Sequence, residues 1–299
     1  MSSDENKEEK TNEHGYGTTG HSWDGIEEWN NPLPRWWVWT FYITVVWGLA
    51  YTIAYPAWPL VSQATAGFLG YSTRAEVAED IAAVTAQNAA ITERLAGAEL
   101  ASLSDDTELL GFARNAGAAV FRASCSQCHG SGAAGVQAAG YPNLLDDDWL
   151  WGGTIDDIAW TIRHGIRNEQ SPDANWSEMP AYGEILTEDE IAGTVQYVLG
   201  LSGQEHDADL AETGAVIFEE QCSACHGAAG MGDASLGAPN LTDAIWLYGG
   251  SAETITETIT YSRFGVMPAW AEEYRPGQGL TDAEINAVAA YVHGLGGGE

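Results

Sequence analysis

Positive charge is the scarcest property of this sequence of 299 residues. Lysine and arginine together number 11, against 43 aspartate and glutamate residues, so the formal net charge is −32. The only lysines are Lys7 and Lys10. Because phosphates would be repelled by so acidic a chain, the composition argues against a nucleic-acid partner. It leaves two interpretations open: solvation in a salty habitat, or docking of a basic partner.

Cysteine is scarce as well, and every cysteine belongs to one of two short motifs. The four residues form two close pairs, each followed at once by histidine: Cys125, Cys128 and His129, then Cys222, Cys225 and His226. A C-x-x-C-H run is the attachment signature of a c-type haem, with the histidine as proximal iron ligand. Disulfides and a zinc ribbon are alternatives, but a ribbon needs both pairs on one small knuckle. The pattern therefore predicts two covalently attached haems c, with His129 and His226 on the irons.

Methionine limits the choice of the sixth iron ligand. Apart from Met1, the chain offers only Met179, Met231 and Met267. Met179 and Met267 each begin a Met-Pro-Ala-aromatic run, and both are predicted to bind iron. Thioether ligation closes the haem and raises its potential, which suits electron transfer better than peroxide or oxygen binding. Met231 is predicted to be a packing residue on a glycine-rich loop, with ligation across the domain boundary as the minority hypothesis.

Charge is absent altogether from residues 36–55, which as a helix are long enough to cross a bilayer, since this takes about 20 residues. The run predicts a membrane anchor. No basic segment leads into a short apolar core before it, so a cleavable signal peptide is not expected. Lys7, Lys10 and Arg35 precede the run, whereas the nearest later base is Arg74. This asymmetry predicts a cytoplasmic N-terminus and haem domains outside the membrane.

The rest of the chain is an internal repeat. The same residue types recur 97 positions later in the second copy: Cys125 corresponds to Cys222, Gly117 to Gly214, and Phe121 to Phe218. Each copy closes with a Thr-x-x-Glu capping box, at Thr187 and Thr281, followed by apolar residues at helical spacing. Each domain is therefore expected to open with a helix leading into its cysteines and to end with a capped amphipathic helix.

These patterns predict an all-α fold, with one N-terminal transmembrane helix followed by two class I cytochrome c domains in tandem. The expected segments are a cytoplasmic segment over 1–34, the transmembrane anchor over 35–58, a periplasmic linker over 59–105, and cytochrome c domains over 106–203 and 207–299. An amphipathic helix is expected over 74–97 within the linker. Arg163, Arg167 and Arg263 are candidates to pair with haem propionates, with surface solvation as the alternative. His164 is expected to be structural or to lie near a propionate.

The residues around the anchor resemble one family. His21 to Glu28 read HSWDGIEE, Asn30 to Trp37 read NNPLPRWW, and Tyr55 to Pro59 read YPAWP. This resembles the anchor region of the dihaem subunit, FixP or CcoP, of cbb3-type cytochrome c oxidases, and the resemblance continues through both haem motifs. It implies a first haem site of Cys125, Cys128, His129 and Met179 and a second of Cys222, Cys225, His226 and Met267.

The resemblance also implies a role in respiration. The chain would relay electrons from a donor cytochrome c, or from the quinol-oxidising complex, to a monohaem cytochrome c subunit and the haem-copper catalytic subunit that reduces oxygen. It would lie in a bacterial inner membrane, with its haem domains in the periplasm and no catalysis of its own. The alternatives are a free membrane-tethered dihaem carrier and, with less support, a dihaem peroxidase.

Overall fold

The computed structural model describes residues 11–298, and the chain divides into two units, residues 1–86 and 87–299. Lys7 and Lys10, on which part of the orientation argument depends, lie outside the described residues. Each unit is treated by itself below.

The first unit begins with a β-hairpin that the sequence patterns did not predict. Its strands are β1 (Thr18–Trp23) and β2 (Ile26–Trp29), which pair antiparallel with Trp23 opposite Ile26. The two residues between them, Asp24 and Gly25, have φ angles of 50° and 85°. A two-residue turn with both φ angles positive matches the twist of the strands, and Asp-Gly is among its preferred sequences.

The predicted apolar helix is confirmed. Helix α1 (Arg35–Ala54) has 20 residues, begins directly after Pro34, and has a mean hydropathy of 1.3. None of its residues is buried against protein, and within residues 11–298 it is the one helix long and apolar enough to cross a membrane. A helix that is apolar on all sides needs an apolar surrounding, which a bilayer provides.

The structure has a helix, α2 (Thr73–Ala96), in the linker where an amphipathic helix was expected over 74–97. Leu95, near its C-terminal end, is buried, whereas Val77, Ile81 and Val84 are exposed. At the same end, Arg94 forms ion pairs with Asp106 (2.6 Å) and Glu108 (3.2 Å). The last turns of α2 therefore belong to the second unit.

The second unit is built almost entirely from helices, which confirms the all-α prediction for this part of the chain. Its α-helices are α3 (Thr107–Val120), α4 (Ser126–His129), α5 (Ile155–His164), α6 (Glu188–Leu201), α7 (Ala208–Ile217), α8 (Ser223–His226), α9 (Ala252–Tyr261) and α10 (Asp282–His293). Both predicted capping boxes are present: Thr187 with Glu190 begins α6, and Thr281 with Glu284 begins α10. Each satisfies orphan donors at its helix start.

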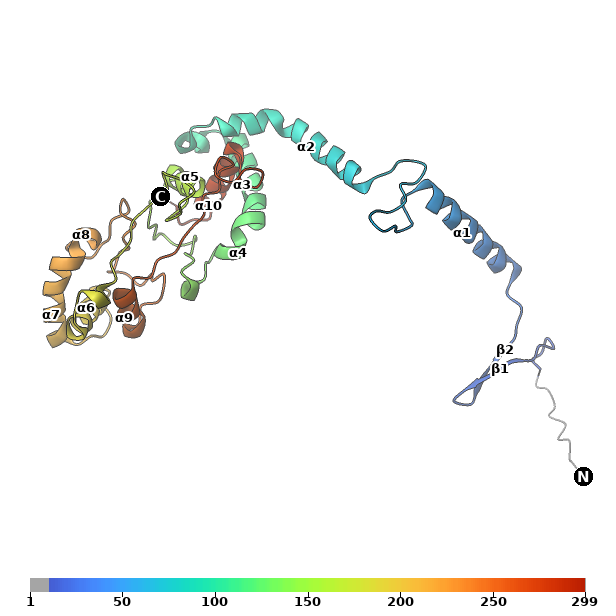
Figure 1. The fold of residues 1–299 in the computed structure, drawn as a ribbon, viewed down its shortest axis with the longest axis horizontal. Coiled ribbons are helices and arrows are strands. Elements are labelled where there is room, and N and C mark those ends of the chain that lie inside the picture. The colour runs from blue at the N-terminus through green and yellow to red at the C-terminus, as the bar shows by residue number, and fades with distance from the viewer. Residues whose placement is uncertain (1–10, 299) are drawn as a thin grey trace, which may run out of the picture. The chain divides into compact units, whose positions relative to one another are not determined.

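The helices pack in an exchanged arrangement. Helix α10, from the second repeat, packs against α3 and α5 of the first, while α6, from the first repeat, packs against α7 and α9 of the second (Figure 1). Two hydrophobic cores result. One joins Phe121 of the first repeat to Ile285 and Val288 of the second, and the other joins Val195 of the first to Phe218 of the second. Each core therefore takes its closing helix from the other repeat.

Glycines let the exchanged helices approach closely. A Cβ atom at Gly117 in α3 would overlap the carbonyl of Ala287 in α10, and one at Gly214 in α7 would overlap the carbonyl of Gly193 in α6. The rings of Phe121 and Tyr291 also meet across the first crossing, 5.4 Å apart between centroids. The two glycines share the 97-position register of the repeat, so both crossings use the same device.

Gly117→Ala is expected to destabilise the holoprotein by about 1 to 3 kcal/mol, because the added methyl must push α10 away from α3. Gly111→Ala, on the same helix, is the matched control, since a Cβ there meets nothing within 4 Å. Alanine favours a helix over glycine by up to about 1 kcal/mol, so the control should be neutral or stabilising. Denaturant unfolding of the haem-loaded chain measures both. Equal effects of the two substitutions would contradict the close crossing.

Candidate haem sites

Each C-x-x-C-H motif lies where a long helix changes into a short one. Helix α3 runs into a π-helical turn, Phe121–Cys125, and then into α4; α7 runs in the same way through Phe218–Cys222 into α8. Phe121 and Phe218 are each only 1% exposed and fix the turns in the cores. A π turn accommodates one extra residue and occurs frequently at functional sites. The sequence patterns did not reveal this wide turn.

No disulfide joins any of the four cysteines. Burial, with a smaller effect of the neighbouring cysteine, raises the pKa of Cys125 and of Cys222 to about 11. Before a haem is attached, both side chains are therefore protonated at neutral pH. Two sulfurs separated by two residues remain available to the vinyl groups of one porphyrin in each motif.

The two histidines of the motifs make the same contact with the backbone. The Nδ1 atom of His129 lies 3.4 Å from the carbonyl oxygen of Pro142, and that of His226 lies 3.0 Å from the carbonyl oxygen of Pro239. Burial lowers the pKa of both rings, which keeps them neutral. With the proton on Nδ1 directed at a carbonyl, Nε2 carries the lone pair that a metal needs.

Pro142 and Pro239 were not singled out from the sequence. They are related by the 97-position offset of the cysteines, and each is followed by Asn-Leu. Both lie 13 positions after the histidine they contact. A search of the repeat for residues preserved beyond the cysteines would have found them.

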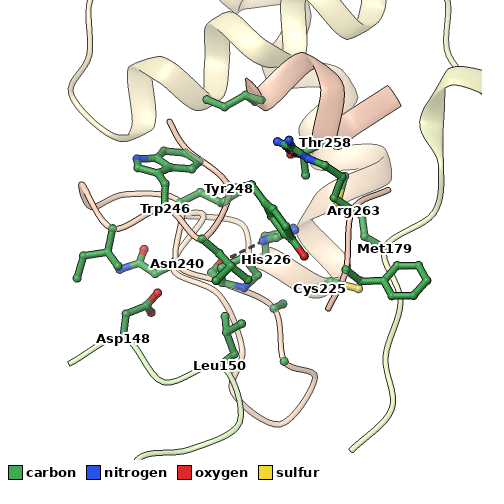
Figure 2. A pocket seen from close by; sticks show the side chains of 18 of the residues that line it. Asp148, Leu150, Met179, Cys225, His226, Asn240, Trp246, Tyr248, Thr258 and Arg263 are labelled. Atoms are coloured by element: carbon green, nitrogen blue, oxygen red, sulfur yellow. Dashed lines mark hydrogen bonds between the residues drawn. The ribbon is translucent and has the colours of Figure 1, made fainter. Parts of the chain in front are cut away.

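A cavity of about 450 Å³ lies against the second motif. Cys222, Cys225 and His226 line it together with Met179, which comes from the first repeat. Figure 2 shows Met179, Cys225 and His226 around this space, with Tyr248 and Arg263 also facing it. Met179 therefore lies with the second motif, not with the first as the resemblance implied.

Met267, from the second repeat, lies with the first motif. It packs against the core that contains Phe121, and Cys125 packs against the same core. Each methionine therefore lies beside the motif of the other repeat, not beside the motif that the resemblance implied. The physical reason is the exchange of closing helices, because each methionine precedes α6 or α10 and follows that helix to the other core.

Met231 is not the packing residue that the sequence predicted, and its ligation across the domain boundary stays an untested hypothesis. Its side chain is 69% exposed, so it is not a packing residue. It lies on the loop after α8, outside both cores.

The polar residues predicted to lie near haem propionates do not all lie at the cavity. Arg167 and Arg263 line the cavity, whereas Arg163 forms an ion pair with Asp282 at 2.7 Å. His164 is 6% exposed, and its Nδ1 lies 3.0 Å from the hydroxyl of Ser171, as expected of a structural histidine.

Two buried polar atoms have no hydrogen-bond partner within residues 11–298: Trp151 Nε1 and one guanidinium nitrogen of Arg275. A buried donor left unpaired is costly, and haem propionates are acceptors of the kind these donors lack. Sequence reasoning missed both residues. The cysteines, the neutral histidines and the two methionines form a donor set that fits haem c at both motifs.

Asp148 gives the cavity a pH-sensitive group. Burial, and then the charges of Asp243, Asp146 and Asp147, raise the pKa of Asp148 to about 6. The pKa of an aspartate in an unfolded chain is about 3.9, so the folded chain holds the proton on Asp148 more tightly than the unfolded chain does. The folded chain therefore loses stability as the pH rises from about 4 to about 6.

Asp148→Asn is accordingly expected to stabilise the haem-loaded chain at pH 7 by roughly 1 to 2 kcal/mol, less than the full pKa shift implies because the carboxylate is partly solvated. The gain should vanish below about pH 4, where the wild-type side chain is protonated in both states. Unfolding at several pH values measures it, with Asp105→Asn at an exposed position as the control. A stabilisation independent of pH would contradict the assignment.

Three family models match parts of the chain. Residues 15–62 match the N-terminal domain of cytochrome oxidase-cbb3, FixP; residues 113–198 match cytochrome c oxidase, cbb3-type, subunit III; and residues 211–296 match cytochrome c.

Curated relatives match over nearly the whole chain. The cbb3-type cytochrome c oxidase subunit CcoP of Cereibacter sphaeroides is 58% identical over 284 residues, 94% of this chain and 95% of the relative. CcoP of Rhodobacter capsulatus is 53% identical over 94% of this chain and 96% of its own, and FixP of Sinorhizobium medicae is 46% identical over 95% and 96%. The resemblance noted in the sequence is confirmed: the chain belongs to the FixP/CcoP family of cbb3-type cytochrome c oxidase subunits.

Proposed function

We propose that this chain is the membrane-anchored, electron-transferring dihaem subunit of a cbb3-type terminal oxidase. The observation that carries the proposal is the repetition of one complete ligand set: a free cysteine pair, a neutral histidine whose Nδ1 faces a proline carbonyl, and a methionine supplied by the other repeat. Haem c supplies a one-electron couple when attached at each motif. The chain's own residues determine how that couple behaves.

The cysteines of each motif hold the porphyrin covalently, through thioethers to its vinyl groups. His129 and Met267 would bind one iron, and His226 and Met179 the other. With a histidine and a methionine on each iron, neither would be open to oxygen or peroxide, and the thioether would raise the potential. Each site would therefore take up and release electrons without substrate chemistry.

The two haem loops are fixed against one another, which a relay requires. A Cβ atom at Gly140 in the first loop would overlap the ring of Tyr248, and one at Gly237 in the second loop would overlap the ring of Trp151. Gln137 also donates a hydrogen bond of 2.8 Å to the carbonyl of Trp246. These contacts cross between repeats in both directions, so the separation of the two haems is set by packing and not by a flexible linker.

The proposed surroundings follow from the anchor and the charge. Helix α1 would cross the bacterial inner membrane once, with the haem unit in the periplasm, because Arg35 begins the helix and no base follows before Arg74. The net charge of −32 suits a basic donor cytochrome c, although solvation in a salty habitat would use the same residues. The acceptors would be a monohaem cytochrome c subunit and the haem-copper catalytic subunit.

Purification from membranes in mild detergent tests the proposal. We expect haem b and copper to co-purify with this chain, and two haems to remain on it after denaturing electrophoresis. A chain that purifies alone with two six-coordinate haems would be a free tethered carrier. A ferrous haem that binds carbon monoxide readily in the intact chain would favour a peroxidase.

A further inference from the structure

Met267 is held by a loop of the other repeat. The backbone N–H of Ile166 donates to the carbonyl oxygen of Met267 at 2.9 Å, and the N–H of Met267 donates to the carbonyl oxygen of Ile166 at 3.0 Å. The side-chain amide of Asn168 adds a third hydrogen bond, from Nδ2 to the same Met267 carbonyl oxygen, at 3.2 Å. The backbone of this methionine is therefore bonded on both its donor and its acceptor.

Asn168 is rigid in this position. It is 8% exposed, and its Nδ2 also donates to the carbonyl of His164 at 2.9 Å, at the end of α5. Its Oδ1 accepts the N–H of Gln170 at 3.1 Å. One amide thus joins the end of a packed helix to the backbone of Met267, and both ends of the amide are satisfied.

Gly165 makes the close approach possible. Its φ angle is +77°, and a Cβ atom there would overlap both the amide of Asn168 and the carbonyl of Met267. Glycine adopts this left-handed conformation without steric cost. The loop is therefore shaped to bring Asn168 onto Met267.

The other methionine is held differently. The hydroxyl of Ser262 donates to the carbonyl oxygen of Met179. In the 97-position register Ser262 corresponds to Gly165, whereas Asn168 corresponds to Gly265, which has no side chain. The amide contact is therefore specific to Met267, and each methionine has one side-chain donor of its own.

We propose that Asn168 is a positioning residue for the thioether of Met267, and that it thereby sets the strength of the iron–methionine bond at the haem attached to Cys125 and Cys128. The inference rests on the haem ligation given under the proposed function. A backbone held at three points presents the sulfur to the iron at little entropic cost, whereas a loosened one lets the weak thioether ligand dissociate. Loss of the thioether lowers the potential and opens the iron.

The test uses the full chain in its purified complex, with the two haems as controls for each other. Asn168→Ala removes the amide, and Asn168→Asp keeps its shape but removes the donor. Ser262→Ala is the matched change at the other methionine. Met267→Ala and Met179→Ala identify which potential belongs to which site. Redox titration, the weak long-wavelength absorption of the iron–methionine bond, and carbon monoxide binding to the ferrous haems are measured.

Both Asn168 substitutions should lower the potential of the haem that Met267→Ala alters, weaken its iron–methionine absorption, and raise its carbon monoxide-reactive fraction several-fold. Ser262→Ala should change only the other haem. Unchanged potentials and carbon monoxide binding in both Asn168 variants would overturn the positioning role. Equal changes at both haems would also overturn it, because they would indicate a general loss of packing. If Met267→Ala itself altered neither haem, the proposed ligation would fail, and the inference with it.

Discussion

Met179→Ala is expected to open the haem attached at Cys222 and Cys225, although Met179 belongs to the first repeat. Met179 lines the cavity of Cys222, Cys225 and His226, and alanine provides no atom that can reach the iron. The affected haem should lose its iron–methionine absorption, bind carbon monoxide when reduced, and show a markedly lower potential. The haem attached at Cys125 and Cys128 should keep its wild-type spectrum.

Double substitutions determine which histidine shares an iron with Met179. Met179→Ala combined with His226→Ala should damage one haem only, because both changes fall on the same iron. Met179→Ala combined with His129→Ala should leave no haem with both axial ligands. The reverse outcome would restore the pairing within each repeat that the family resemblance implied. Met231→Ala serves as the control, since this exposed side chain should affect neither haem.

Replacing Cys222 and Cys225 together by alanine is expected to halve the haem that stays on the chain under denaturing conditions. Without the two sulfurs no thioether can form at the second motif, while Cys125 and Cys128 still hold the first haem. The remaining haem should keep the absorption of its iron–methionine bond, because Met267 packs with the first motif. Haem stain after denaturing electrophoresis and the mass of the chain measure attachment.

Ser223→Ala provides the matched control, inside the same motif. Its hydroxyl donates only to the carbonyl of Glu219, at 2.7 Å, so two haems per chain should remain attached. Two covalent haems on the variant without Cys222 and Cys225 would show that this motif is not an attachment site.

Much of the local structure could be predicted because its causes are local. The capping boxes at Thr187 and Thr281 were readable, since side chain and backbone three residues apart satisfy one another without distant help. Helix α1 was readable because an uncharged run of its length has few other stable conformations. The hairpin at Asp24 and Gly25 was missed, although Asp-Gly between alternating residues is a known turn signal.

The residues that contact the site residues were harder to predict from the sequence. Pro142 and Pro239 could have been found from the repeat, because each occupies the same register after its histidine. Trp151 and Arg275 could not, since their significance lies in buried donors without partners, which only packing reveals. Asn168 also required the structure, because its contact with Met267 joins residues 99 positions apart.

The sequence by itself determined the residue types of the two haem sites, the anchor, the linker helix, and the helices that open and close each repeat. Only the tertiary structure decided which methionine lies beside which motif. The repeats make α6 and α10 similar, so either could in principle close either core. Two features distinguish the two helices. The first is the short connection over residues 202–207, which places α6 beside α7, its neighbour in sequence. The second is a hydrogen bond from the side chain of Asn286 in α10 to the carbonyl of Leu95 at the end of α2; α6 has Ala192 at the position equivalent to Asn286 and cannot make it. Connection length and one buried hydrogen bond thus select the exchanged pairing, and neither is visible in a motif.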